Sequence, residues 1–355
     1  MCIRQIFGDL DVNVHDVIVN FQIQGRVHDI IPWGNGHIND SYRVINEDEM
    51  SPDYLLQRVN HLVFENVDGL MQNLQKVTDH IQAKDEFQVL VLNIIPTKEG
   101  EAYFNNPSGF WRMFEFVSDK KTYDRAENAE LAYKAGSTIG KFVVALSDFP
   151  VDELHLTIPD FHNIRFRIQQ FEDALERGDS IRREEAEEEI KKVQALSKDY
   201  MDLYDFAISG EIPLRVTHND TKFNNVLLSD VEDMGIVIDL DTIMPGYVFY
   251  DLGDGLRSGV IEADEDESDL SKVILNEAFY RAYMDGFLKA SKSILTQKEI
   301  AILPKSGSYM AFIMAVRFLT DFLNGDVYYK TEYQEHNLVR ARCQLKVCEL
   351  FQEYA

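Results

Sequence analysis

Apolar positions recur along the chain with two different spacings, and the change of spacing divides the sequence into two parts. In the first third, short apolar and β-branched runs alternate with turn residues, which is typical of strands. These runs are RVHDIIPWGNG (26–36), INDSYRVINED (38–48), DYLLQRVN (53–60) and GEAYFNNPSGFWRMFEFV (100–117). Between the third and fourth runs, apolar residues at helical spacing predict one helix, from Val67 through Leu70, Leu74 and Val77 to Ile81.

After Val117 the helical spacing dominates. One long helix is predicted by Leu131, Ala135, Ile139, Phe142 and Leu146, and a helical pair with a charged, solvated middle is expected over 160–208. Further helices are predicted over 269–290, 296–302, 305–324 and 335–353, and Thr296 with Glu299 forms a capping-box pattern. We therefore expect an α+β protein with a small strand-rich part (1–117) and a larger helical part (118–355), joined tightly near 116–124.

Composition limits the class of partner. The 355 residues carry a net charge of −26, from 35 basic and 61 acidic side chains, and no basic groove is evident. A polyanion would be repelled, so nucleic acid and anionic membrane are poor partners. The N-terminus lacks a signal-type apolar region, and the longest apolar run, FQVLVLNIIP, is far short of the ~20 residues that span a bilayer. We expect a cytoplasmic monomer or weak homo-oligomer with three reduced cysteines.

The segment VTHNDTKFNNVLLSDVEDMGIVIDLDTI (216–243) concentrates polar groups around two apolar runs. Val226–Leu228 and Ile236–Ile238 flank turn residues and predict a β-hairpin, which brings Asn225 and Asp239 to the same end. An amide oxygen beside a carboxylate suits Mg²⁺, which prefers one or two carboxylates plus substrate phosphates.

The residues around this hairpin suggest further roles. Asp220, on the loop that leads into the hairpin, is a candidate base for a hydroxyl nucleophile in phosphoryl transfer, and His218 is expected to hold that loop. Alternation along an extended segment would place Asp241 on the same face as Asp239, as a second-shell or second metal ligand or as a contact to substrate. Asp251 is expected to cap or brace the catalytic loop.

HNDTKFNN (218–225) together with IDLD (238–241) resembles the catalytic and metal motifs of the aminoglycoside phosphotransferase and choline kinase superfamily. Within it, LRVTHNDTKFNNVLL, IDLDTIMPG, DLGD, RFLTDFLNGDVYY and EHNLVRARCQLK are most similar to the bacterial N-acetylhexosamine 1-kinases. The resemblance implies a protein-kinase-like fold with a nucleotide-binding N-terminal lobe and a C-terminal catalytic and acceptor-binding lobe. It also implies that Asp220 is the catalytic base, that Asn225 and Asp239 bind Mg²⁺, and that ATP is the phosphate donor.

The nucleotide side is less distinctive. Gly34 and Gly36 lie between strand-like runs, where backbone amides can approach phosphates, although a plain hairpin turn at Asn35-Gly36 explains them equally. His37 and Asn39 near the tip are candidates for contacts to phosphate or sugar.

The phosphate and adenine contacts expected of a kinase are harder to place. Protein kinases carry a phosphate-contacting lysine on the third strand, where this chain has Gln57 beside Arg58; neighbours on a strand face opposite sides, so only one of them can face the nucleotide. The backbone of Glu115 to Val117, where the two parts join, is the expected adenine contact.

An arginine on an apolar helix face is the main feature on the acceptor side. Arg317 lies with Met310, Ile313, Met314 and Phe318, and either pairs with an internal aspartate or binds sugar. The resemblance favours Arg317 and Tyr328, together with His37, as acceptor contacts. We expect an ATP- and Mg²⁺-dependent kinase of the anomeric hydroxyl of N-acetylhexosamines. The alternatives are a choline, ethanolamine or aminoglycoside kinase, or a pseudokinase-like binding module, which Gln57 would favour.

Overall fold

The N-terminal part of the protein is built on an antiparallel sheet. The computed structural model describes residues 13–34 and 38–354. The sheet has five strands in the order β1-β2-β3-β5-β4. Their bounds are Val27–Pro32 (β1), Asp40–Asn46 (β2), Tyr54–Val59 (β3), Phe104–Asn106 (β4) and Gly109–Glu115 (β5). All four strand-like runs of the sequence are thus strands, and the last of them forms two.

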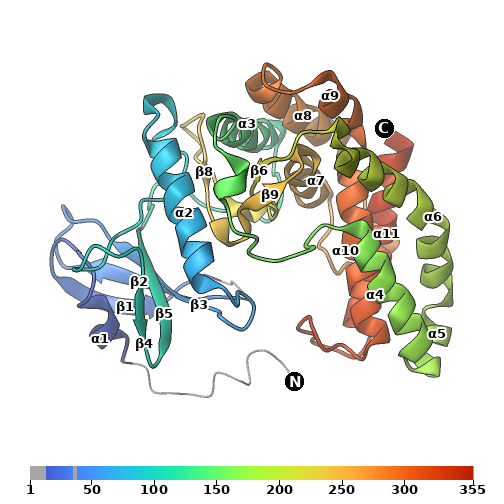
Figure 1. Ribbon diagram of the computed structural model, residues 1–355, viewed down its shortest axis with the longest axis horizontal. Coiled ribbons are helices and arrows are strands. Elements are labelled where there is room, and N and C mark those ends of the chain that lie inside the picture. Colours follow the sequence, from blue (N-terminus) through green and yellow to red (C-terminus); the bar gives the residue numbers. More distant parts are fainter. Residues whose placement is uncertain (1–12, 35–37, 355) are drawn as a thin grey trace.

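The two faces of this sheet pack against different partners. One face carries Val44, Leu56, Trp111 and Met113, which form a small buried core with helix α1 (Val14–Ile18). The other face turns toward helix α2 (Val67–Gln82), whose bounds agree with the predicted helix. Figure 1 shows α2 between the sheet and the helical part of the molecule.

Helix α2 also ties the two parts together. The fully buried amide of Asn73 donates hydrogen bonds to the backbone oxygens of His155 (2.8 Å) and Ile243 (3.0 Å), both in the C-terminal part. Residue 117 as the boundary between the two parts stays a prediction.

The C-terminal part is mostly helical, as expected. Its helices are α3 (Ala129–Ala145), α4 (Ile164–Arg177), α5 (Ser180–Glu185), α6 (Glu187–Phe206), α7 (Val248–Gly259), α8 (Glu277–Ser291), α9 (Gln297–Ile302), α10 (Ser306–Leu323) and α11 (His336–Tyr354). Helix α10 packs against α4, α7 and α11, and most of its residues are buried. The expected capping box of α9 is confirmed, whereas α8 begins later than predicted because Asn276 caps its N-terminus.

Two short strand pairs carry the polar segment 216–243. Strand β6 (Arg215–Thr217) pairs with β9 (Met244–Gly246), and β7 (Val226–Leu227) pairs with β8 (Ile236–Val237), which confirms the predicted hairpin. Figure 1 places β8 beside α3 and β6 with β9 beside α7, on the side of the helical part that faces α2. Residues 218–225 and 238–243 therefore lie where the two parts meet.

Candidate active site

The loop after β6 is held by a buried carboxylate. Asp251 on α7 is fully buried, and its two oxygens accept hydrogen bonds from the backbone N–H groups of His218 (2.9 Å) and Asn219 (2.7 Å). Asn219 adopts a left-handed conformation (φ 66°), and its amide group donates to the backbone oxygens of Thr217 and Thr242 (both 3.0 Å). These contacts turn the chain sharply just before Asp220.

His218 and His162 fix the same loop from two sides. The Nδ1 atom of His218 accepts the backbone N–H of Asp220 (3.2 Å), and its Nε2 atom donates to the backbone oxygen of Ile238 (2.8 Å), which joins the loop to the hairpin. His162 donates through Nε2 to the backbone oxygen of Asn219 (2.7 Å). Burial lowers the pKa of His162 to about 3, so this imidazole is neutral in the native protein.

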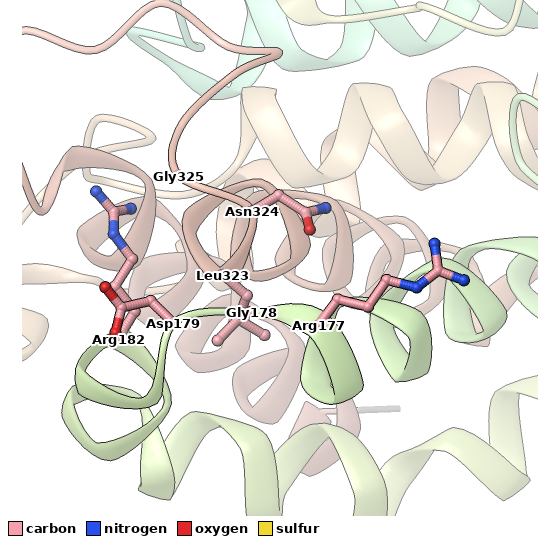
Figure 2. Close-up of a pocket in the computed structure, with 7 residues that line it drawn as sticks. All are labelled: Arg177, Gly178, Asp179, Arg182, Leu323, Asn324 and Gly325. Carbon is pink, nitrogen blue, oxygen red and sulfur yellow. The ribbon is translucent and has the colours of Figure 1, made fainter.

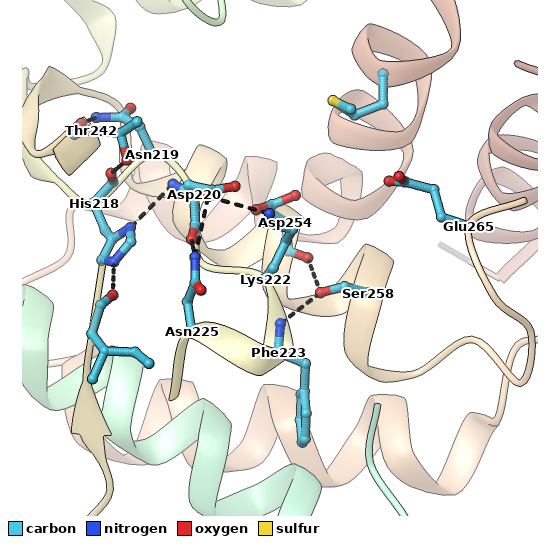
Figure 3. Close-up of polar contacts among 12 residues, drawn as sticks. His218, Asn219, Asp220, Lys222, Phe223, Asn225, Thr242, Asp254, Ser258 and Glu265 are labelled. Carbon is cyan, nitrogen blue, oxygen red and sulfur yellow. Dashed lines mark hydrogen bonds and ion pairs between the residues drawn. The ribbon is translucent and has the colours of Figure 1, made fainter. Parts of the chain in front are cut away.

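Asp220 lies among groups that keep it ionised (Figure 3). Its Oδ2 atom accepts a hydrogen bond from the Asn225 side chain (3.1 Å) and lies 3.4 Å from the ammonium of Lys222. Burial raises the pKa of the Asp220 carboxyl, but the charges of Lys222 and of its other neighbours outweigh this effect, and the pKa falls below its ordinary value. The same attraction raises the pKa of Lys222. Asp220 is therefore a carboxylate, able to accept a proton.

Asn225 and Asp239 are neighbours across the hairpin, as the sequence predicts. The backbone N–H of Ile238 donates to the backbone oxygen of Asn225 (3.0 Å), so Asp239 follows directly beside it. The Asn225 amide nitrogen also donates to the backbone oxygen of Asp220 (2.7 Å). Within the described residues, no hydrogen bond or ion pair is made by the amide oxygen of Asn225 or by the carboxylate of Asp239. Two unused hard oxygens side by side fit a divalent cation.

The negative charge around Asp239 also favours a bound cation. Asp239 is exposed at the surface, but the protein around its carboxyl group displaces part of the water. This desolvation, together with the negative charges of Asp241 and Asp220, raises the pKa of Asp239 to about 6. A site in which carboxylates repel one another favours a cation. Among the described residues, no group of three or more histidine, cysteine or acidic side chains forms a metal site. A cation here would thus depend on ligands from a substrate, as Mg²⁺ commonly does.

The expectation that Asp239 and Asp241 share one face of an extended segment is wrong. Asp239 has a left-handed conformation (φ 60°, ψ 54°), and Leu240–Thr242 forms a single 3₁₀ turn. This turn sends the carboxylate of Asp241 toward the N-terminal sheet, where Arg112 forms a buried ion pair with one oxygen and the Asn39 amide donates to the other at 2.7 Å. Both oxygens of Asp241 thus have protein partners.

The other predicted nucleotide contacts are spread over the N-terminal part. Gly34 is exposed with a left-handed φ of 76°, and Gly36 and His37 lie outside the described residues. The backbone N–H of Glu115 donates to Asn93 (3.0 Å). Within the described part of the chain the N–H of Val117 has no acceptor. Gln57, the position of the expected lysine, contacts Ser41 and Arg112 instead.

Arg317 has no acidic partner among the described residues, so the predicted alternative of an internal salt bridge is not observed there. Its guanidinium lies over the rings of Phe161 (5.0 Å) and Tyr329 (5.6 Å). Arg167 lies close by: its side chain donates to the backbone oxygen of Phe161 (3.0 Å), and burial, followed by the charge of Arg317, lowers its pKa to about 10. Phe161 precedes His162, which bonds to Asn219, so Phe161 lies near the loop that carries Asp220.

Tyr328 belongs to a loop organised by a buried aspartate. The Asp321 carboxylate accepts the backbone N–H groups of Val327 (3.0 Å), Tyr328 (2.8 Å) and Tyr329 (2.9 Å). The ring of Tyr328 is exposed and packs edge-on against Tyr329 at 4.8 Å.

Sequence reasoning missed Arg112, Arg167 and Lys222. Lys222 was within reach, because it lies two residues after Asp220 in HNDTKFNN. A separate shallow hollow lies between the ends of α4 and α10 and is lined by Arg177, Gly178, Asp179, Arg182 and Leu323–Gly325 (Figure 2). None of the residues 218–225 contributes to it.

The fold and this site define a kinase-like phosphotransferase. The chain belongs to the phosphotransferase enzyme family, whose model matches residues 29–290. Within the described residues, no helix combines the length and apolar character needed to span a bilayer.

Three solved structures show the same protein-kinase-like fold. An amicoumacin kinase in complex with AMP-PNP and Ca²⁺ is 13% identical, with a TM-score of 0.63 and 99% of both chains covered. A microcompartment-associated aminopropanol kinase is 14% identical, with a TM-score of 0.63 and 96% of both chains covered. A choline kinase from Cryptosporidium parvum Iowa II is 14% identical, with a TM-score of 0.56 and coverage of 92% of this chain and 90% of that one.

Proposed function

We propose that the protein is an ATP- and Mg²⁺-dependent kinase that phosphorylates the anomeric 1-hydroxyl of N-acetylglucosamine or N-acetylgalactosamine. Asp220 is the catalytic base, and Asn225 with Asp239 holds the metal. The nucleotide lies against the N-terminal part, near Gly34 and the free N–H of Val117.

The chemistry assigned to Asp220 follows from its surroundings. The oxygen of the acceptor hydroxyl forms a bond to the γ-phosphorus, the bond from that phosphorus to the β–γ bridging oxygen breaks, and ADP leaves. The hydroxyl proton passes to the Asp220 carboxylate, which its lowered pKa keeps ionised. Lys222 and Asn225 hold this carboxylate in place. When bound, Mg²⁺ would neutralise charge on the phosphates.

The observation that carries the choice of a neutral acceptor is the pair Arg167 and Arg317. Both guanidinium groups lie beside Phe161, next to the catalytic loop, and neither has a carboxylate partner among the described residues. Two uncompensated positive charges repel cationic acceptors such as choline or an amino alcohol. They can donate hydrogen bonds to the hydroxyl and acetamide oxygens of a sugar, and the rings of Phe161 and Tyr329 offer an apolar surface for it.

An acceptor panel tests the proposal. The protein is incubated with ATP, Mg²⁺ and N-acetylglucosamine, N-acetylgalactosamine, glucose, choline, ethanolamine or an aminoglycoside. ADP release is measured, and phosphorus NMR of the product locates the phosphate. We expect turnover with the two N-acetylhexosamines and phosphate on the anomeric carbon. Preferential turnover of choline, ethanolamine or an aminoglycoside would refute the proposed acceptor, and no turnover with any of them would favour a binding module.

A matched pair of arginine variants tests the acceptor side. Arg167→Met removes a charged donor and should raise the KM for the sugar by roughly 10- to 100-fold, the scale of losing a charge-assisted hydrogen bond. The control is Arg165→Met on the same helix, because Arg165 is exposed and pairs with Asp205. Its KM should match the wild type. Equal KM values in the two variants would remove Arg167 from the acceptor site.

A further inference from the structure

Three polar side chains form a row across one face of the N-terminal sheet. Ser41 on β2 is directly opposite Gln57 on β3, and Gln57 is directly opposite Arg112 on β5. Residues opposite each other in a sheet lie on the same face. The Gln57 amide nitrogen donates to the Ser41 hydroxyl (3.0 Å), and its amide oxygen accepts from Nε (3.1 Å) and Nη2 (2.9 Å) of Arg112. Gln57 therefore fixes the plane of the Arg112 guanidinium.

The remaining end of this guanidinium reaches the C-terminal part. Its Nη1 atom donates to Asp241, and the side chains of Arg112 and Asp241 are only 1% and 4% exposed. The second oxygen of Asp241 accepts from Asn39, whose own amide oxygen accepts the backbone N–H of Asn60 (3.0 Å). The N-terminal part thus holds both oxygens of a carboxylate that lies two residues after Asp239.

The ion pair of Arg112 and Asp241 should be strongly destabilised by the loss of either partner. Removing either member of a buried ion pair leaves an uncompensated charge, which is strongly unfavourable. Because Asp239 and Asp241 are joined by a single tight turn, a shift of Asp241 also shifts Asp239. The protein-kinase lysine pairs with a glutamate on the helix that follows its strand, whereas the acidic partner of Arg112 comes from the loop of Asp239.

We propose that Arg112 is a positioning residue: by holding Asp241 from the sheet, it aligns the Asp239 loop with the nucleotide-binding part. Gln57 is the orienting partner of this arginine and not a weakened lysine. The inference rests on the proposed role of Asp239 as a metal ligand, but it does not depend on which acceptor is used.

Binding of a non-hydrolysable ATP analogue tests the inference without an acceptor. Titration calorimetry with AMP-PNP is carried out over a series of Mg²⁺ concentrations for the wild type, Arg112→Met and Arg112→Lys. Loss of a residue that orients a metal ligand typically weakens metal binding by roughly 10- to 100-fold, and we expect this loss for Arg112→Met. Arg112→Lys keeps the charge and should recover part of the affinity. If Arg112→Met does not fold, Arg112→Lys and Asp241→Asn carry the same test.

The control is a second buried arginine. Arg215 forms a bidentate ion pair with the fully buried Glu299 inside the C-terminal part. Arg215→Met should lower stability, as Arg112→Met does, while leaving the Mg²⁺ dependence of AMP-PNP binding unchanged. Asp241→Asn should weaken binding as Arg112→Met does. The double variant should bind no more than about twofold worse than either single variant, because the two residues act as one unit.

The outcomes separate the inference from the proposed function. If the wild type binds no AMP-PNP with Mg²⁺, the proposed function fails. If the wild type binds and a folded Arg112→Met binds equally well, the positioning role of Arg112 is overturned. Asp241→Asn could also lose much more affinity for AMP-PNP with Mg²⁺ than Arg112→Met, with the two losses adding in the double variant. This result would make Asp241 a direct metal ligand and would also overturn the inference.

Discussion

His162 should make the stability of the protein depend on pH in a way that a single variant can remove. The imidazole is buried, and its Nε2–H donates to the backbone oxygen of Asn219. Protonation would therefore add a proton to Nδ1, which is buried and has no hydrogen-bond partner within the described residues. The new cation would also face Arg317 and Arg167. Burial, followed by these charges, accounts for a native pKa of about 3 against 6.5 for an ordinary histidine.

The magnitude follows from linkage. Between the two pKa values the unfolded chain binds a proton that the native protein refuses, so stability is lost as the pH falls from 6.5 toward 3. At pH 5 the His162 imidazole is almost fully protonated in the unfolded chain and almost fully neutral in the native protein. The free energy of unfolding is therefore lower by about 2 kcal/mol than at pH 8. Asp251 affects stability in the opposite direction. Burial raises its pKa to about 6, so its contribution to the free energy of unfolding is lost as the pH rises through that value.

Urea unfolding of the metal-free protein at pH 8 and pH 5 is the assay, with His162→Gln as the comparison. Glutamine keeps an N–H donor for Asn219 but does not titrate, and Asp251 contributes equally to both proteins. The wild type should lose about 2 kcal/mol more than the variant between the two pH values. An equal pH dependence in wild type and variant would show that His162 is not held neutral by its surroundings.

Three further substitutions have defined outcomes. Asp220→Asn should lower kcat by roughly 10²- to 10⁴-fold although the variant still folds, and near-normal kcat would remove Asp220 as the base. Gln57→Lys should weaken binding of the Mg²⁺-nucleotide in calorimetry, because a second cation would face Arg112. Tighter binding would contradict the role of Gln57 as the orienting partner of Arg112. Gly246→Ala would place a Cβ atom 2.1 Å from the hydroxyl of Thr217 and should cost about 1–3 kcal/mol in urea unfolding; an unchanged midpoint would contradict this packing.

Local patterns predicted much of this structure. Helix α2 could be predicted because its apolar residues follow one helical period within a single short segment. The capping box of α9 could be predicted because Thr296 and Glu299 are only three residues apart. The hairpin that joins Asn225 to Asp239 is also local, since its two strands are separated only by a short turn. For this reason the sequence could bring Asp220, Asn225 and Asp239 together.

The errors arise where a local assumption or a distant contact decides. Alternation presumed an extended chain after Asp239, but the left-handed conformation of that residue reverses the direction of Asp241. Arg112 lies in an apolar strand, and its hydrogen-bond partners among the described residues are distant in sequence: Gln57 is 55 residues away and Asp241 is 129 residues away. Only the register of β3 with β5 and the docking of the two parts identify it. Arg167 was missed because its closeness to Arg317 arises only from the packing of α4 against α10.

The most direct test of the whole account is phosphorus NMR of one reaction mixture containing the protein, ATP, Mg²⁺ and N-acetylglucosamine, repeated with Asp239→Ala. The wild type should produce ADP and a sugar phosphorylated at its anomeric carbon, and the variant should produce neither. A wild type that forms no sugar phosphate, or a variant that forms it at the wild-type rate, would contradict the account.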